Sequence, residues 1–315
     1  MSVLSACARS AGLQLGKRVD SWINRNGLDS NPRLANALVD MYAKCGEIDT
    51  ARSLFDGMEV KNIVSWNVMI GGHTHVSEYK EALAVFRHMQ LERVEPNDVT
   101  FLNILPACAQ MGALDMGRWI HVYINKNCHH LQNSSVWTSL IDMYAKCGSI
   151  ESAKQVFFGL ETKSLSSWNV MISGLAMHGN AHGAIDLFSK LIEEGIEPDD
   201  VTFVGLLSAC SHGGMVELGR LHFSSMVQDY KIQPKLPHYG CMIALLGRAR
   251  LFDEAKSLLA CMDIEPDGAI WSSLLGACRI HGNLELGEYA ACSIFKLDPN
   301  NHGAYVLVSN IYAGA

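Results

Sequence analysis

Histidine and cysteine are the residues best suited to nucleophilic or metal-dependent chemistry here, and their spacing indicates neither. The chain has 13 histidines and 10 cysteines, but no Cys-x-x-Cys pair and no zinc-binding combination of His-x-Glu with Pro-Cys-x-x-Cys. The close histidine pairs, His73 with His75 and His129 with His130, are more typical of surfaces or loops than of a metal site. Walker phosphate loops, Gly-x-Ser-x-Gly and Gly-x-Gly-x-x-Gly are also absent from the sequence. We therefore expect no catalytic residue, metal or cofactor.

The cysteines instead mark repeated positions. Four of them follow alanine at one repeat position and two share another: Cys7, Cys108, Cys210 and Cys278, then Cys45 and Cys147. Residues that recur once per repeat are typical of small packing groups rather than of disulfide partners. We expect reduced thiols in an intracellular protein.

Sequence segments return after an offset of 102 residues. The pairs are 41–46 (Met-Tyr-Ala-Lys-Cys-Gly) with 143–148, 66–70 (Trp-Asn-Val-Met-Ile) with 168–172, and 98–101 (Asp-Val-Thr-Phe) with 200–203. Such repetition is typical of stacked structural units that share one core. Function is then expected on a surface that many units share.

A shorter pattern recurs within each block: a small residue followed by apolar residues three, four and seven positions later, which is one face of an α-helix. The small residues are Gly16, Ala51, Ala82, Gly117, Ala153, Ala184, Gly219, Ala255 and Gly287. They are spaced 35, 31, 35, 36, 31, 35, 36 and 32 residues apart. We interpret them as sites of close helix packing, although Asp20 and His121 interrupt the apolar pattern of two helices.

A second apolar segment precedes each of these helices, as in Trp66, Met69 and Ile70. Each unit is therefore predicted to be a pair of antiparallel helices, with glycine after Cys45, Cys147 and His178 at the tight turns. Prolines at 96, 198, 234 and 266 separate units. Stacking nine such pairs predicts an all-α, right-handed α-solenoid with a concave groove.

Composition adds three constraints. The chain is 49% hydrophobic and has no apolar run long enough to span a bilayer, so we expect no membrane segment. A net charge of −7 argues against a strongly basic nucleic-acid binder. The sequence starts and stops inside a unit, which predicts a fragment of a longer array without a signal or transit peptide.

The repeated segments resemble one known family. A helix pair of about 34 residues fits either tetratricopeptide repeats, which bind peptides, or pentatricopeptide repeats, which bind single-stranded RNA. The segments Ser-Trp-Asn-Val-Met-Ile, Met-Tyr-Ala-Lys-Cys-Gly and Glu-Pro-Asn/Asp resemble the plant pentatricopeptide repeat family, PLS subclass, over essentially the whole chain. In that subclass, P, L and S units of about 35, 35 and 31 residues alternate, as the observed spacings do.

The resemblance divides the chain as follows. Residues 1–267 form the repeat array: a partial L unit at 1–31, then S at 32–62, P at 63–97, L at 98–133, S at 134–164, P at 165–199, L at 200–235 and S at 236–267. Residues 268–301 resemble an E motif, and 302–315 resemble the start of a second, truncated E motif.

The resemblance also implies which residues read RNA, because the fifth and last residues of each unit discriminate bases in this family. These are Asn36 and Asn62, Asn67 and Asn97, Leu102 and Asn133, Thr138 and Ser164, Asn169 and Asp199, Val204, and Gly240 with Asp267. In 5′ to 3′ order they imply a pyrimidine, a pyrimidine, an unread or loosely read nucleotide, a weak purine preference and a uracil. Leu102 and Val204 contribute only sterically, and the pair at Gly240 implies no assigned base.

Two alternatives for these polar residues stay open. Asn97, Asp199 and Asp267 lie beside proline and also suit turn or helix-cap chemistry. Lys44, Lys146 and Arg248 recur at one helix position and either contact RNA phosphates or are solvated charges at helix ends.

The implied function is sequence-specific binding of single-stranded RNA in a mitochondrion or chloroplast. This binding would guide RNA processing, in particular C-to-U editing. Cytidine deamination requires a zinc site that this chain lacks, so a deaminase domain or an editing cofactor protein would act through the E motifs. The alternative is a helical-repeat scaffold, similar to tetratricopeptide proteins, that binds protein and no RNA.

Overall fold

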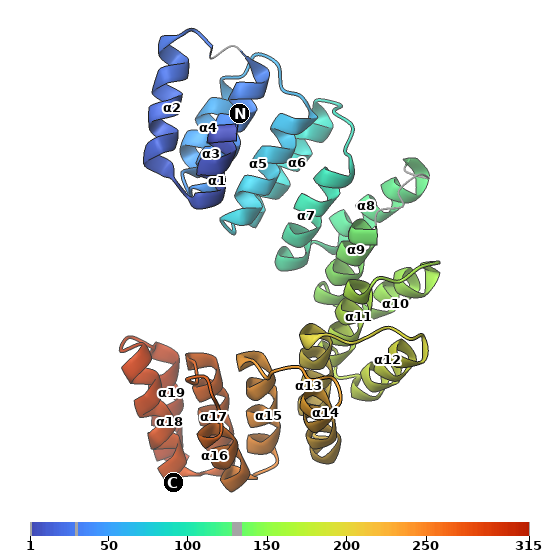
Figure 1. The fold of residues 1–315 in the computed structure, drawn as a ribbon, viewed down its shortest axis with the longest axis vertical. Coiled ribbons are helices and arrows are strands. Elements are labelled where there is room, and N and C mark those ends of the chain that lie inside the picture. Colours follow the sequence, from blue (N-terminus) through green and yellow to red (C-terminus); the bar gives the residue numbers. More distant parts are fainter. Residues whose placement is uncertain (1, 29–30, 128–133, 315) are drawn as a thin grey trace. The chain divides into compact units, whose positions relative to one another are not determined.

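The chain folds entirely into α-helices in a computed structural model that describes residues 2–28, 31–127 and 134–314. The predicted all-α solenoid of stacked antiparallel helix pairs is confirmed. The helices form two compact units, Met1–Glu161 and Thr162–Ala315. Within each unit, successive helix pairs follow one another in chain order (Figure 1).

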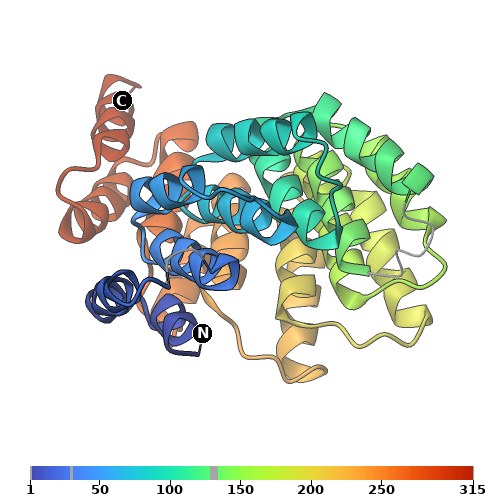
Figure 2. The ribbon, with the colours of Figure 1, turned by 90° about the horizontal axis from the view of Figure 1, so that it is seen from above.

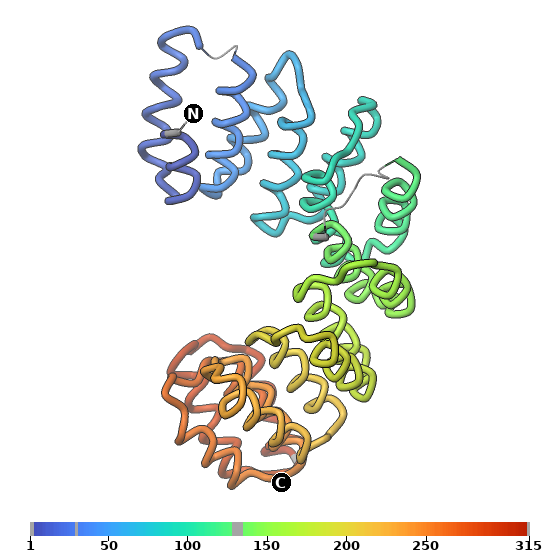
Figure 3. Tube along the Cα trace, turned by 45° about the vertical axis from the view of Figure 1, so that its right-hand side comes forward, coloured from blue at the N-terminus to red at the C-terminus, as the bar shows by residue number. Residues whose placement is uncertain are grey.

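The first unit contains ten helices among its described residues. They are α1 (Ser2–Ser10), α2 (Leu13–Arg25), α3 (Pro32–Lys44), α4 (Ile48–Asp56), α5 (Ile63–His75), α6 (Tyr79–Leu91), α7 (Asp98–Met111), α8 (Leu114–Asn127), α9 (Ser134–Lys146) and α10 (Ile150–Gly159). Each odd-numbered helix packs against the next odd-numbered helix, and each of α2, α4, α6 and α8 packs against the odd-numbered helices before and after it. The Cα trace shows the antiparallel course of each pair (Figure 3).

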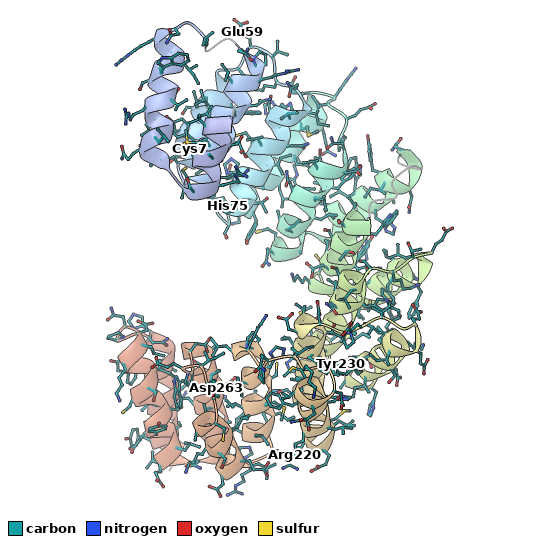
Figure 4. All side chains as sticks on the ribbon, viewed as in Figure 1. Cys7, Glu59, His75, Arg220, Tyr230 and Asp263 are labelled. Atoms are coloured by element: carbon teal, nitrogen blue, oxygen red, sulfur yellow. The ribbon has the colours of Figure 1, made fainter. Side chains whose placement is uncertain are left out.

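The second unit repeats this arrangement. Its described helices are α11 (Leu165–Met177), α12 (Ala181–Glu193), α13 (Asp200–Gly213), α14 (Val216–Gln228), α15 (Leu236–Arg248), α16 (Phe252–Ala260), α17 (Gly268–His281), α18 (Leu284–Leu297) and α19 (His302–Gly314). The exception is α16, which packs on α15 but not closely on α17. Arg220 of α14 is labelled in Figure 4. Its guanidinium pairs with Glu254 of α16 at 2.7 Å.

Local chemistry explains where the helices begin and turn. From α3 onward, each odd-numbered helix begins at the first residue of a predicted repeat or E-motif segment. Gly46 and Gly148 adopt φ of +83° and +84° at the turns after α3 and α9, a conformation that other residues rarely adopt. These turns let α4 fold back on α3 and α10 fold back on α9. Figure 2 shows the helices from above.

The small residues of the repeat pattern lie at helix crossings, as predicted. Ala51, Ala82 and Ala153 have no exposed surface. A Cβ added at Gly16 would lie 2.4 Å from Sδ of Met41, and one added at Gly117 would lie 2.3 Å from Sδ of Met143. A side chain at Gly16 or Gly117 would therefore displace the facing methionine, whereas the crossings at Ala51, Ala82 and Ala153 accommodate a methyl group.

Candidate nucleic-acid interface

The predicted base-recognition residues of the first P unit meet in the structure. Nδ2 of Asn67 on α5 donates to Oδ1 of Asn97 at 3.0 Å, although the two residues are 30 positions apart. The hydroxyl of Thr100 on α7 donates to Oδ1 of Asn67 at 2.6 Å. Asn67 is only 6% exposed. Its amide is thus held in one orientation, with one N–H and one lone pair left for another partner.

The second P unit repeats this geometry with a carboxylate. Nδ2 of Asn169 donates to Oδ1 of Asp199 at 2.9 Å, and the Thr202 hydroxyl donates to Oδ1 of Asn169 at 2.6 Å. No described residue hydrogen-bonds the other carboxylate oxygen, Oδ2 of Asp199, and none bonds Nδ2 of Asn97. The two P units therefore differ in the group that remains, which is an acceptor at Asp199 and a donor at Asn97.

The first S unit is looser. Nδ2 of Asn36 lies 3.5 Å from Oδ1 of Asn62, and Oδ1 of Asn36 is buried without a partner among the described residues. Ser65 takes the place of Thr100, but its hydroxyl reaches Asn62 only. The described residues therefore leave Oδ1 of Asn36 buried and unpaired, which costs folding free energy.

The last residues of the units also begin helices, which confirms the cap role that the sequence left open. Each accepts a hydrogen bond from the backbone N–H three residues later. They are Asn62 before α5, Asn97 before α7, Ser164 before α11, Asp199 before α13 and Asp267 before α17. In both P units the same side chain caps a helix and also bonds the fifth residue of its unit.

An open cavity of about 770 Å³ lies beside the first P pair. Asn67, Asn97, Asp40 and Lys44 are among its lining residues, which come from α1, α3, α5 and α7. His75, at the end of α5, also lines it (Figure 4). One cavity thus holds a predicted base-reading pair and a predicted phosphate-contacting lysine.

A second cavity, of about 410 Å³, lies in the second unit beside the last S repeat. Gly240, Arg248 and Asp267 line it. A Cβ added at Gly240 would meet only Cγ1 of Ile270, at 3.8 Å. Gly240 occupies the fifth position, where the P units carry asparagine, so no side chain fills that space in this unit.

The remaining predicted residues have less distinctive surroundings. Leu102 on α7 and Val204 on α13 are half-buried and offer no side-chain hydrogen bond. Thr138 on α9 and Ser164 are half-buried, in the first and second unit respectively. Asn133, His129 and His130 lie outside the described residues.

The three cations differ in their pairing. Lys44 pairs with Asp40 at 2.9 Å and Lys146 with Asp142 at 2.8 Å, each one helical turn apart. Arg248 has Ala244 at the corresponding position and no carboxylate partner among the described residues, and its Nη1 donates to the backbone oxygen of Ser211 at 2.9 Å. Local carboxylates thus offset both lysines but not the arginine.

The described residues show little sign of reactive chemistry. Burial raises the pKa of the Cys108 thiol to about 12 and that of Cys210 to about 11, so both thiols stay protonated at neutral pH. No three or more histidine, cysteine or acidic side chains gather as a metal site in the described ranges. None of the described helices is long and apolar enough to cross a membrane.

Sequence reasoning missed the threonines that hold the asparagine amides. Thr100 and Thr202 are fully buried, and each bonds both members of its pair. Their signal was present in the repeated segment Asp-Val-Thr-Phe, which begins both α7 and α13. Asn103 was also missed, and its Nδ2 donates to the backbone oxygen of Asn67 at 2.9 Å.

Comparison with known families agrees with this repeat structure. The PPR repeat family model matches residues 61–110 and 163–212, and the PPR repeat model matches 34–63, 135–165 and 237–264. Together they cover more than half of the chain. The chain belongs to the PPR repeat family. A separate E motif model matches residues 281–315 of this PPR chain, overlapping both segments that the sequence assigned to E motifs.

Known PPR proteins align along the whole chain. A chloroplastic pentatricopeptide repeat-containing protein of Arabidopsis thaliana is 58% identical over 316 residues, covering 100% of this chain and 43% of the relative. A mitochondrial one from the same plant is 42% identical over 346 residues, covering 100% of this chain and 51% of the relative. The chain thus spans about half the length of the curated relatives it matches.

The fold is also found in solved structures. The crystal structure of the pentatricopeptide repeat protein PPR10 in complex with an 18-nt psaJ RNA element aligns with a TM-score of 0.77 at 18% identity. It covers 95% of this chain and 45% of that chain. A crystal structure of PPR10 from maize aligns with a TM-score of 0.68 at 17% identity and covers 95% of this chain and 44% of that chain.

Proposed function

We propose that this PPR chain binds single-stranded RNA in a sequence-specific manner. The observation that carries the proposal is the repeated arrangement of Asn67 with Asn97 and Asn169 with Asp199. In each pair a buried threonine fixes the amide, and one polar group of the last residue is left without a partner. Fixed polar edges between neighbouring helices suit recognition of an unstacked base.

The chemistry of the remaining groups supports different bases at the two P units. Oδ2 of Asp199 accepts a hydrogen bond, which fits the N3–H of uracil and disfavours cytosine, whose N3 carries a lone pair. Nδ2 of Asn97 donates a hydrogen bond, which fits an acceptor on a pyrimidine edge. This agrees with the base order implied by the family resemblance: pyrimidine for the first P unit and uracil for the second.

Substitution of Asp199 tests the assignment. Asp199→Asn makes the second P pair identical to the first and keeps a residue suited to capping α13. We expect the preference for uracil over cytosine at the matching nucleotide to fall about tenfold, since one well-placed hydrogen-bonding contact is lost. Dissociation constants at fixed salt, for RNAs that differ only at that nucleotide, measure it.

Asp186→Asn is the matched control, because Asp186 is an exposed carboxylate on α12 and the substitution changes the charge equally. It should leave the uracil preference intact. Equal, weak binding of the unaltered chain to the predicted RNA and to a scrambled RNA would refute RNA recognition. That result would favour the protein-binding scaffold.

We further propose that the whole protein acts in a plant organelle and selects sites for C-to-U editing, with no catalysis by this chain. Chloroplastic and mitochondrial relatives and the E motif match at 281–315 support this role. Sequencing organellar transcripts from plants that lack the protein tests it. An editing pattern unchanged at every site would exclude the role.

A cavity beside the E motif supports the proposal of an editing partner. A cavity of about 630 Å³ opens where α16 does not pack closely on α17, and its lining includes Leu259, Trp271, Leu286 and Tyr289. Two of these four lie within the matched E motif. An apolar cavity of this kind supports docking of a deaminase or editing cofactor protein.

A further inference from the structure

Sulfur atoms gather where the first helices of neighbouring repeats meet. Sγ of Cys45, the cap residue that follows α3, lies 3.9 Å from Sδ of Met41, one helical turn earlier. The same sulfur lies 3.8 Å from the backbone oxygen of Cys7 on α1 (Figure 4). Burial raises the pKa of Cys45, and the nearby Cys7 thiol raises it further. Two thiols and one thioether, from residues up to 38 positions apart in the sequence, thus lie close together.

The arrangement is repeated 102 residues later. Sγ of Cys147 lies 3.5 Å from the backbone oxygen of Cys108 on α7. Burial, and after it the Cys147 thiol, raises the pKa of Cys108 to about 12. Met143 takes the place of Met41, and a Cβ added at Gly117 would lie 2.3 Å from its Sδ. The absence of a side chain at this glycine therefore makes room for the methionine sulfur.

The two clusters are closed on one side and reachable on the other. Their cysteines on α1 and α7 and both methionines are at most 2% exposed. Cys45 and Cys147, at the helix ends, are partly exposed. A small ligand can therefore enter through the partly exposed thiol, whereas the other two sulfurs are shielded from large reagents.

The third copy of this position differs from the first two at both helix-end sulfurs. Leu245 takes the place of the methionine, and Ala249 takes the place of the second cysteine. Cys210 remains, and another thiol near it, that of Cys241, lies 3.9 Å from the backbone oxygen of Val204. Leucine fills about the same volume as methionine, so packing alone does not require the two positions to change together. Joint presence or joint absence is expected of two ligands that bind one ion.

We propose that each of the two clusters binds one Cu(I) ion through its three sulfur atoms, those of Cys7, Met41 and Cys45 and those of Cys108, Met143 and Cys147. Thiolate and thioether are soft ligands, which favour Cu(I). Metal–sulfur bonds of about 2.3 Å set about 120° apart place two sulfurs about 4 Å from each other. The distance of 3.9 Å between the sulfurs of Cys45 and Met41 is close to this value.

Other ions suit the clusters less well. Protein zinc sites have four ligands drawn from cysteine, histidine and carboxylates, and methionine is not among these ligands. Magnesium and calcium prefer oxygen ligands. The third ligand here is methionine, which also explains why no zinc-type motif or cluster marks the position.

Binding is a proton-for-metal exchange. Each ion replaces two thiol protons, which pass to solvent, and no electron is transferred. The bound cluster has one net negative charge, and the partly exposed cysteine keeps that charge in contact with water. Because the thiols have to lose their protons, binding weakens as the pH falls. Each ion joins the first helices of two neighbouring repeats, α1 with α3 and α7 with α9.

Anaerobic titration of the reduced full chain tests the proposal. Cu(I) is supplied as its complex with the chromophoric chelator bicinchoninate, and the absorbance of that complex reports how much copper the protein removes. Met41→Leu with Cys45→Ala gives the first cluster the residues of the third copy. Met143→Leu with Cys147→Ala does the same for the second cluster. We expect each pair of substitutions to remove one equivalent of tightly held copper and all four substitutions to remove two.

The difference between chains is the quantity to compare, because Cys210 has sulfur neighbours of its own in Cys241 and Met242. Cys261→Ala is the matched control, since Cys261 is an exposed thiol that belongs to neither cluster. It should remove no equivalent. Circular dichroism checks that the variants stay helical, as expected for residues that the third copy already contains.

X-ray absorption at the copper edge counts the ligands directly. The unaltered chain should show three sulfur ligands per copper. Met41→Leu with Cys108→Ala, which removes the thioether from the first cluster and disables the second, should show two.

Three results would overturn the proposal. Equal copper uptake by the unaltered chain and the variant with all four substitutions means that the ions bind elsewhere. Loss of an equivalent in Cys261→Ala as well means that copper binds thiols without selectivity. Two sulfur ligands per copper in the unaltered chain means that methionine is not a ligand. None of these measurements depends on RNA, so their failure leaves the proposed RNA binding untouched.

Discussion

Polar residues that interrupt the apolar helix pattern have polar partners in the next helix pair. The hydroxyl of Tyr42 donates to Oδ2 of Asp20 at 2.7 Å, and 102 residues later the hydroxyl of Tyr144 lies 3.0 Å from Nδ1 of His121. The third copy has Phe223 and Leu246 at these positions, in one hydrophobic cluster. The two residues thus change together from one repeat to the next, because a buried polar atom needs a partner.

This pairing predicts how His121 contributes to stability. His121→Phe leaves the buried Tyr144 hydroxyl without its partner, and we expect unfolding to become easier by about 1–3 kcal/mol. Adding Tyr144→Leu reproduces the apolar third copy and should recover most of that loss. Urea unfolding of the single and double variants measures the coupling. Strictly additive losses would contradict it.

The same residue predicts a pH dependence. Burial lowers the pKa of His121 below its ordinary value of 6.5. Below that value the unfolded chain binds the proton more readily than the folded one, so the stability is present above pH 6.5 and is lost as pH falls through the folded pKa. The double variant should therefore lose less stability than the unaltered chain between pH 7 and acid, as thermal unfolding would show.

At helix crossings, the sizes of the two contacting residues also change together from one repeat to the next. Gly71 on α5 faces Asn103 on α7, and an added Cβ would lie 3.1 Å from Nδ2 of Asn103. In the second unit Ser173 on α11 faces Gly205 on α13, where an added Cβ would lie 2.8 Å from Oγ of Ser173. The glycine moves from one helix to the other, so each crossing keeps one small residue.

Much of this architecture could be predicted from sequence, because helix period, breakers and caps are local signals. The turns at Gly46 and Gly148 and the close crossings at Gly16 and Gly117 are examples. The resemblance named Asn67 and Asn97 together as base-recognition residues, but the hydrogen bond between them, which joins residues 30 positions apart, was not predicted.

The remaining features of the site depend on three-dimensional neighbours. The crossing of α5 and α7 brings Thr100 to the Asn67 amide and orients it. The same crossing determines which amide atom stays available. The cavity at Gly240 depends on the distance between α15 and α17. Periodicity sets which face of a helix is buried, but it does not set these distances.

For the whole molecule, a net charge of −7 has to be reconciled with RNA binding. Long-range attraction to phosphate is not supplied by net charge, so affinity depends on where individual cations lie. Lys44 lines the cavity of the first unit, but so does Asp40, its partner at 2.9 Å. The acid weakens the field that the lysine presents to a phosphate.

Asp40→Ala tests that balance, because Ala244 already occupies this repeat position beside Arg248. Releasing Lys44 should tighten RNA binding and steepen the fall of log affinity with log salt by about 0.7, the contribution of one phosphate contact on a single strand. Binding measured over a series of salt concentrations provides the slope. Asp115→Ala on α8 removes the same charge outside the cavity, from a residue whose ion-pair partner among the described residues is Arg118. If this control steepens the slope equally, net charge and not the position of Lys44 governs binding.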